Sequence, residues 1–279
     1  MKPISETLSQ FETLLDRTPE TAVSAPGRVE LLGNHTDYND GYVMSVALDV
    51  KVSIAAAKRD DGIVRVYSSA YDTAEEFNAE SPEQTGKWVD YVQGVINELA
   101  KKGITSGGFD AYVTSDVPSG AGLSSSAALE VATAMTVQSL YPYTIEPFEM
   151  AQVCRAAENN FVGMNCGILD QFSSVFGKEN SVLFLDCRTG DHDSIPLSRD
   201  DVSIVICNSM KQHELVSSQY NVRREECMAG AAHFRKNHPE VKLLRDVSVE
   251  MFEQEQEGME EGAMKRSHHV VYENERVLK

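Results

Sequence analysis

A loop of small residues between two regular segments carries the groups best suited to bind an anion. The loop covers 117–126, follows a strand-like run at 109–114 and opens a helix-like run at 127–140. The first turn of a helix has backbone N–H groups without intrahelical partners and therefore attracts anions. Glycine allows close approach of the backbone, and serine hydroxyls can hold phosphate oxygens or Mg²⁺. The pattern predicts a phosphate-binding loop, whose candidate residues are Gly120, Ala121, Gly122, Leu123, Ser124, Ser125 and Ser126.

The same loop also fits an ordinary connection between a strand and a helix. Serine is a good N-cap, and turns that contain glycine join such elements in many proteins. Three other nucleotide-binding patterns are absent: the loop has no P-loop lysine and no third glycine of a dinucleotide fingerprint, and the chain contains neither H-R-D nor D-F-G. The phosphate and turn interpretations therefore both remain open.

A second polar loop, at 33–41, lies between two extended segments and is rich in glycine, asparagine and aspartate. Loops of this kind often hold sites. His35 and Asp37 could hydrogen-bond a polyol or could stabilise the turn. Arg28 lies in the apolar segment just before the loop, where its guanidinium needs a carboxylate or phosphate partner or must extend to solvent.

Two further residues allow a functional and a structural interpretation. Asp170 follows a Gly-Met-Asn-Cys-Gly turn at the start of a short helix. Its carboxylate is either exposed in a cleft or placed there because an acid interacts well with the helix dipole. Trp88 lies in the apolar stripe of a helix, where it is either a core residue or a platform for a purine.

Helix and strand patterns alternate along the chain, which predicts an α/β protein of one large or two modest domains. The expected helices cover 4–16, 88–99, 127–140, 145–161, a segment that begins near 217, and 264–279. The expected strands cover 46–58, 63–68, 109–114, 181–186 and 202–208. A polar loop is expected at 71–86, and the acidic segment 250–261 is expected to be a solvated helix face.

Composition restricts the partners. The 279 residues include 42% hydrophobic residues and carry a net charge of −18, which argues against a broad surface for nucleic acid or anionic membranes. A polyanionic substrate must therefore be bound by local dipoles, a few cations and metal. The five cysteines are scattered without C-x-x-C, and no apolar run resembles a signal peptide or a membrane span. We expect reduced thiols and a cytoplasmic location, and the oligomeric state is not predicted.

Four motifs in order resemble galactokinases. Ala25-Pro26-Gly27-Arg28-Val29 with 33–41 resembles the galactokinase signature, and 117–130 resembles the second motif of the superfamily of galactose, homoserine, mevalonate and phosphomevalonate kinases. The segments 163–171 and 218–224 also match galactokinases. The similarity extends from about residue 20 to the end of the sequence.

The resemblance implies an α+β fold of two domains. The first would be a ribosomal-protein-S5-like domain over 1–180 that binds ATP and sugar, and the second an incomplete α+β domain over 181–279. The implied activity is Mg²⁺-dependent transfer of phosphate from ATP to the anomeric hydroxyl of galactose or a close relative. Its small-molecule partners would be the sugar and ATP. The alternative is a non-catalytic regulatory protein of the same fold that binds galactose and ATP.

The resemblance also implies roles for individual residues. Asp170 corresponds to the catalytic aspartate and Arg28 to the arginine that pairs with it. The residues that correspond to sugar-binding positions are Asn34, His35, Asp37, Gly167 and Tyr220. Trp88 and Tyr91 correspond to the adenine pocket. Ser126, with Ser125 as the alternative, and Glu158 correspond to the Mg²⁺ ligands.

The sequence departs from the family in several places. Asn34 stands where galactokinases usually have glutamate, which leaves the preferred sugar open, although an amide still donates and accepts hydrogen bonds. Ser119 stands where a leucine often covers the adenine, and Glu30 replaces an asparagine. The sequence also ends before the third, glycine-rich motif of the family. We therefore expect either a C-terminally truncated chain, which need not be active, or a partner that supplies the rest.

Overall fold

The structure is a computed structural model that describes residues 4–197, 201–208 and 216–279. The chain divides into two compact units. The first contains Met1–Val29, Ala47–Met164 and Asp170–Phe176, and the second contains Glu30–Val46, Asn165–Leu169 and Gly177–Lys279. Each unit thus draws on separate stretches of chain, and the domain boundary near residue 180 stays a prediction.

The first unit is built on a mixed β-sheet, which contains both antiparallel and parallel strand pairs. Its strands are β1 (Thr21–Leu32), β2 (Tyr42–Arg59), β3 (Ile63–Ser68), β4 (Thr73–Asn78) and β5 (Gly108–Ser115), and β1 and β2 also contribute residues to the second unit. The order is β4-β3-β5-β2, with β1 paired to β2. The β3–β5 pair is parallel, whereas β3–β4 and β2–β5 are antiparallel.

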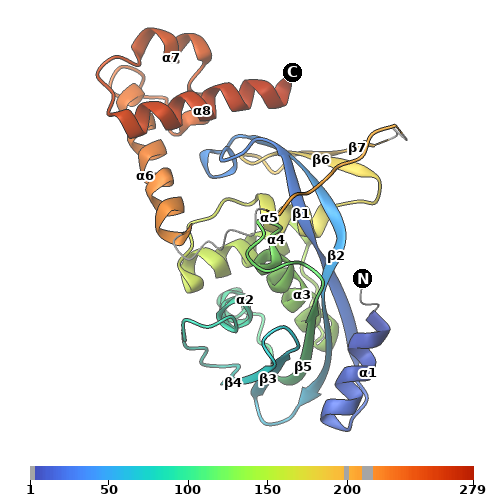
Figure 1. Cartoon of the computed structure of the whole chain (residues 1–279). Coiled ribbons are helices and arrows are strands. Elements are labelled where there is room, and N and C mark those ends of the chain that lie inside the picture. The colour runs from blue at the N-terminus through green and yellow to red at the C-terminus, as the bar shows by residue number, and fades with distance from the viewer. Residues whose placement is uncertain (1–3, 198–200, 209–215) are drawn as a thin grey trace. The chain divides into compact units, whose positions relative to one another are not determined.

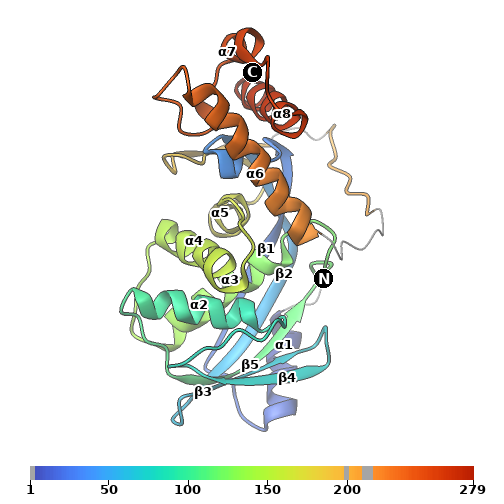
Figure 2. The same cartoon turned by 90° about the vertical axis from the view of Figure 1, so that its left-hand side faces the viewer.

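Helices cover both faces of this sheet because successive residues of a strand point to opposite sides. Ile54 and Ala56 of β2 belong to the large core cluster, which includes residues of α2 (Asp90–Lys101), α3 (Ser125–Leu140) and α4 (Pro147–Ala156). Ala55 and Ala57 belong to a smaller cluster on the other face, together with Phe11 of α1 (Ile4–Leu15). Figures 1 and 2 show α1 on one side of the strands and α2, α3 and α4 on the other.

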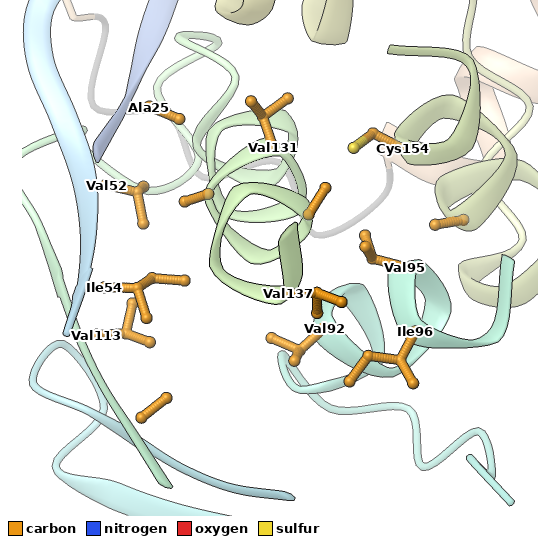
Figure 3. Close-up of a cluster of buried hydrophobic side chains, with 14 of the residues drawn as sticks. Ala25, Val52, Ile54, Val92, Val95, Ile96, Val113, Val131, Val137 and Cys154 are labelled. Atoms are coloured by element: carbon orange, nitrogen blue, oxygen red, sulfur yellow. The ribbon is translucent and has the colours of Figure 1, made fainter. Parts of the chain in front are cut away.

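The helix that follows the small-residue loop, α3, lies in the middle of the large core. Figure 3 shows Val131 and Val137 of α3 between strand residues such as Ile54 and the α2 residues Val92 and Val95. Buried positions occur on all sides of α3 and include several alanines. A helix that is apolar all round must be enclosed. The core therefore fixes the position of this helix and of the loop at its N-terminus.

Two short helices of the first unit carry candidate site residues. The helix expected at 145–161 is α4 followed by a π-helical segment, Ala157–Val162, in which Glu158 is buried. Isolated π-turns of this kind are frequent at functional sites. The expected short helix is α5 (Leu169–Phe176), with Asp170 in its first turn.

The second unit contains strands β6 (Ser181–Asp186) and β7 (His192–Pro196) and the first residues of β2, to which β6 pairs. Its helices are α6 (Val216–Arg235), α7 (Val249–Glu255) and α8 (Glu261–Leu278). The three helices pack together (Figures 1 and 2) around a core that includes Phe234, Phe252 and Val270. Tyr38, from the short 3₁₀-helix Asp37–Asn39, is also part of this core.

Three predictions about elements were wrong. The expected loop at 71–86 contains β4, an edge strand of mostly polar residues with a single aromatic side chain, Phe77, so that its sequence resembles a solvated segment. Strand β7 was not expected, because His192–Pro196 is polar and mostly exposed. The expected strand at 202–208 is not a strand: its backbone is irregular and Val205 is 78% exposed. Over the described ranges, none of the helices is long and apolar enough to cross a membrane.

Candidate functional site

The small-residue loop bends sharply just before α3. Gly120, Gly122 and Ser124 all have positive φ angles, of 70°, 72° and 57°. The two glycines adopt this conformation without strain, whereas Ser124 does so at a cost. The hydroxyl of Ser124 does not cap α3 and instead donates to Oδ2 of Asp170 at 2.6 Å. Ser124 therefore stands at the N-cap position of α3 but does not cap the helix with its side chain.

Arg28 and Asp170 form an ion pair beside this loop. Nη2 and Nε of Arg28 lie 2.6 and 3.0 Å from Oδ1 of Asp170, and Nη1 donates to the backbone oxygen of Gly122 at 2.7 Å. The arginine side chain is only 13% exposed, so it does not extend to solvent. Together with Ser124, Arg28 fixes both oxygens of the Asp170 carboxylate, whose side chain remains 26% exposed.

Glycine at position 27 allows this arrangement. A Cβ there would lie 2.6 Å from the backbone oxygen of Leu123, and the adjacent amide of Arg28 donates to the same oxygen at 3.2 Å. Strand β1 and the loop therefore approach each other at van der Waals contact, which a larger residue would prevent.

A pocket of about 620 Å³ lies beside the loop, within the usual size range of small-molecule sites. Its walls include the predicted residues Trp88, Tyr91, Gly120, Ser125 and Ser126, and also Ser119, Tyr71 and Lys87. Trp88 stacks on Tyr71 with a ring-centroid distance of 5.8 Å and an interplanar angle of 14°. Its indole N–H has no hydrogen-bond partner among the described residues. Trp88 is thus a pocket residue, although it also packs against the core.

Asp90 holds the segment that leads into this pocket, a role that sequence reasoning missed. Its carboxylate is nearly inaccessible and accepts hydrogen bonds from the backbone amides of Thr85 and Gly86, at 2.6 to 3.0 Å. It also accepts from the Thr85 hydroxyl and from the Gln93 amide. The only sequence signal was an acid at the start of a helix, which is common in proteins without a site.

The two predicted metal ligands lie close together at the start of α3. The Ser126 hydroxyl donates to Oε1 of Glu158 at 3.4 Å, and Ser125 and Ser126 both line the pocket. A hydroxyl and a carboxylate are oxygen ligands that suit Mg²⁺, which usually leaves its other positions to phosphate and water. The residues present therefore fit this ion. Among the described residues there is no cluster of three or more His, Cys, Asp or Glu side chains that could bind a metal ion.

A second buried carboxyl lies behind Glu158. Glu130 is fully buried, and its Oε2 accepts from Nε2 of Gln171 at 2.9 Å. Burial, together with the charge of Glu158, raises the pKa of Glu130 well above its usual value and favours its neutral form.

The predicted sugar-binding residues lie in the second unit. The ring of Tyr220 lies 5.8 Å from that of His35, and Gly167 lies so close to Asp37 that a Cβ on Gly167 would collide with the Asp37 carboxylate. The Asn34 side chain donates to Glu30 at 3.0 Å. The structure thus brings the predicted residues together as two contacting pairs, while Asn34 bonds to a residue that also departs from the family.

Several side chains hold the turn at 33–41. The Thr36 hydroxyl bonds to the backbone oxygens of Gly33 and Tyr42, and Asn39 donates to the backbone oxygen of His35. The His35 ring bonds to the Tyr38 hydroxyl within the same turn, so His35 also contributes to its structure.

His35 is a neutral imidazole with a hydrogen-bond partner at each ring nitrogen. Its Nε2 accepts from Arg223 at 3.2 Å, which leaves Nδ1 to donate to the Tyr38 hydroxyl at 3.0 Å. Burial, followed by the positive charges of Arg223, His269 and Arg266, lowers the pKa of His35 to about 4. Arg223 lies in a predicted motif, but its contact with His35 could not be inferred without the structure.

We expect His35 to make the protein less stable in mild acid. Because its pKa is lower in the folded than in the unfolded chain, the stability that it contributes is present above about pH 6.5 and is lost as the pH falls toward 4. The loss is about 3 kcal/mol at most, since the side chain is partly exposed. Urea unfolding between pH 7.5 and 4.5 should show a shallower decline for His35→Gln than for the unmodified chain. Equal slopes would contradict the buried neutral state.

Comparison with known proteins agrees with this geometry. Residues 90–178 match the GHMP kinases N terminal domain, and residues 9–58 match the galactokinase galactose-binding signature. The crystal structure of Lactococcus lactis galactokinase complexed with galactose matches with 31% identity and a TM-score of 0.91. The match covers 98% of this chain and 72% of that one.

More distant structures share the fold alone. Mevalonate kinase from Methanococcus jannaschii matches 63% of this chain and 55% of its own, with 18% identity and a TM-score of 0.54. Streptococcus pneumoniae phosphomevalonate kinase, solved with phosphomevalonate and AMPPNP, matches 92% of this chain and 80% of its own, with 14% identity and a TM-score of 0.53. The predicted mixed α and β fold of these kinases is confirmed. On the strength of the Lactococcus match and of both sequence signatures, the chain belongs to the galactokinase family of the GHMP kinases.

Proposed function

We propose that the protein transfers the terminal phosphoryl group of ATP to the anomeric hydroxyl of galactose, which gives galactose 1-phosphate and ADP. The observation that carries the proposal is the ion pair of Arg28 and Asp170 at the loop before α3, beside a pocket of suitable size. The galactose complex of the Lactococcus enzyme supports the choice of sugar.

In this proposal the pocket binds the nucleotide. The adenine stacks on Trp88, whose other ring contact is Tyr71, and the phosphates lie at the N-terminus of α3. The free amides of the first helical turn and the positive end of its dipole attract the phosphates. Ser126 and Glu158 would hold Mg²⁺, and the ion would neutralise charge on the phosphate oxygens.

Asp170 and Arg28 then act on the reacting atoms. The bond between the sugar oxygen and phosphorus forms while the bond between phosphorus and the bridging oxygen of ADP breaks, and Asp170 accepts the proton of the sugar hydroxyl. The Arg28 guanidinium stabilises the negative charge on the transferring group, which is the main requirement of this reaction. Ser124 and Arg28 hold the carboxylate in one orientation before the substrate arrives.

The second unit supplies groups for the sugar. Asp37 accepts hydrogen bonds from sugar hydroxyls, and the Tyr220 hydroxyl provides a further polar atom. Burial and then the charge of Arg223 keep His35 neutral, and His35, whose two ring nitrogens bond to Arg223 and Tyr38, supports the ring of Tyr220 from the side. Asn34 can also donate to the sugar, in place of the acceptor that a glutamate would offer.

A panel of monosaccharides tests the proposal. Mg·ATP is added together with galactose, glucose, mannose or N-acetylgalactosamine, and ADP release and sugar phosphate are both measured. We expect galactose 1-phosphate as the main product. If galactose and ATP bind but no sugar phosphate accumulates, the regulatory alternative is supported and the proposal fails.

Gly167→Ala should weaken galactose binding specifically. The added methyl group would displace the Asp37 carboxylate, and such overpacking costs about 1–3 kcal/mol, which corresponds to roughly 5- to 150-fold in affinity. The KM for galactose should rise by that factor while the KM for ATP stays within about twofold. Gly262→Ala is the matched control, since a Cβ there would likewise collide with a carboxylate, that of Glu226, which has no role in the proposed site. An unchanged galactose KM would contradict the assignment of Asp37.

A further inference from the structure

The Gln171 side chain joins two buried carboxyl groups. Its Nε2 donates to Oε2 of Glu158 at 2.7 Å and to Oε2 of Glu130 at 2.9 Å. Gln171 and Glu130 are fully buried, and Glu158 is 4% exposed. Each carboxyl group thus receives one hydrogen bond from Gln171, which reduces the cost of burying it, whereas Oε1 of Glu130 and Oε1 of Gln171 have no hydrogen-bond partner among the described residues.

The amide of Gln171 can take only one orientation. If it were turned by 180°, its oxygen would face Oε2 of Glu158, and a carboxylate that binds a metal has no proton to donate, so that hydrogen bond would be lost. Glu158 therefore determines which end of the amide is nitrogen, and the bond from the same nitrogen to Oε2 of Glu130 agrees with this assignment. The hydrogen bond to Glu130 also restrains Gln171, which in turn fixes one oxygen of Glu158.

The other oxygen of Glu158 is the one that lies toward Ser126. Ser126 donates to Oε1, while Gln171 holds Oε2. The arrangement is therefore a chain of four side chains that runs from Glu130 through Gln171 and Glu158 to Ser126. Its buried end is fixed, and its other end is at the nucleotide pocket.

Gln171 also directly follows Asp170 at the start of α5. Consecutive helical residues point in directions about 100° apart. Asp170 accordingly bonds to Arg28 and Ser124, whereas Gln171 bonds to the buried carboxyl groups. One turn of helix thus anchors both carboxylates that are used in the proposed reaction.

We propose that Gln171 is a positioning residue that fixes the carboxylate of Glu158 for Mg²⁺, and that Glu130 fixes Gln171. This inference rests on the proposed function, because it assumes that Glu158 binds the metal that accompanies the nucleotide. Groups that orient a metal ligand in this way typically change metal affinity by about 10- to 100-fold when they are replaced.

The test compares nucleotide binding with and without metal in Gln171→Met. Methionine has a similar length but donates no hydrogen bond. Binding of a non-hydrolysable ATP analogue is measured by calorimetry, once with excess Mg²⁺ and once with EDTA. In the unmodified protein Mg²⁺ should tighten binding. In Gln171→Met that gain should fall by about 10-fold or more, while binding in EDTA stays within about twofold.

Gln138→Met is the matched control. Gln138 is a partly buried glutamine of α3 that accepts from the Ile145 amide, and it has no role in the proposed site. It should keep the full effect of Mg²⁺. If Gln171→Met does not fold, Glu130→Leu removes the second acceptor and should reduce the effect of Mg²⁺ in the same sense.

The outcomes separate this inference from the proposed function. If Mg²⁺ does not tighten nucleotide binding even in the unmodified protein, the metal assignment of the proposed function fails, and the inference with it. If Mg²⁺ acts normally in the unmodified protein and equally in Gln171→Met, only the inference is overturned. The same holds if both binding constants of the variant weaken in parallel, because that result would indicate a purely structural role.

Discussion

Asp170→Asn should lose nearly all turnover while it still binds ATP. The amide cannot accept the proton of the sugar hydroxyl, and the loss of a positioned base lowers rates by about 10²- to 10⁴-fold. Asparagine retains the size of aspartate and an oxygen that can accept from Arg28, so the fold should be kept. Turnover is measured by coupled ADP release, and ATP binding by the fluorescence of Trp88, the single tryptophan of the sequence.

Asp110→Asn is the matched control for this change. Asp110 is also a carboxylate paired with arginines, Arg17 and Arg59, but it lies on β5 outside the proposed site. It should lower thermal stability and leave kcat close to its original value. If Asp170→Asn turned over at the normal rate, the proposed chemistry would be wrong.

Arg28→Ala should reduce kcat by roughly 10³- to 10⁵-fold, the range associated with arginines that stabilise the transferring phosphoryl group. The substitution removes that charge and also releases Asp170 and the backbone oxygen of Gly122. Arg28→Lys should recover only part of the rate, because an ammonium cannot form the same paired contacts. Steady-state kinetics on the three proteins measure both effects.

Arg17→Ala provides a close control. Like Arg28, Arg17 bonds to an aspartate carboxylate, that of Asp110 at 3.1 Å, and to a backbone oxygen, that of Lys58 at 3.0 Å, and it also lies 3.7 Å from Glu20. Its loss should change kcat by less than about twofold. Equal losses of rate in both variants would mean that Arg28 acts only through the stability of the fold.

Helices and strands whose apolar residues recur at a regular spacing could be predicted from the sequence, whereas elements without such a pattern could not. The apolar stripe of α2 and the buried run of β5 depend on local patterns, and both were predicted nearly to their ends. Strand β4 depends on its pairing with β3, because its own sequence is acidic. The segment 202–208 shows the opposite case, since its apolar pattern predicts a strand that the described structure does not form.

The same distinction holds for the site. The residue types of the loop, of Arg28 and of Asp170 left a functional and a structural interpretation open, and only the resemblance to galactokinases predicted that they belong to one site. The bonds of Ser124 to Asp170 and of Gln171 to Glu130 join residues 46 and 41 positions apart. No local pattern encodes such a contact, since it results from the packing of α5 beside α3. The roles of the individual residues in sugar, nucleotide and metal binding stay predictions.

The left-handed backbone of Ser124 has a consequence for the evolution and engineering of this protein. Glycine adopts that conformation freely, whereas serine gives up about 1 kcal/mol or more there. A screen that rewards only resistance to heat would therefore favour glycine at this position and discard the hydroxyl. We expect variants enriched by such a screen to have a higher melting temperature and a lower turnover rate. Any effort to stabilise this protein should therefore measure both the activity and the melting temperature of variants at position 124.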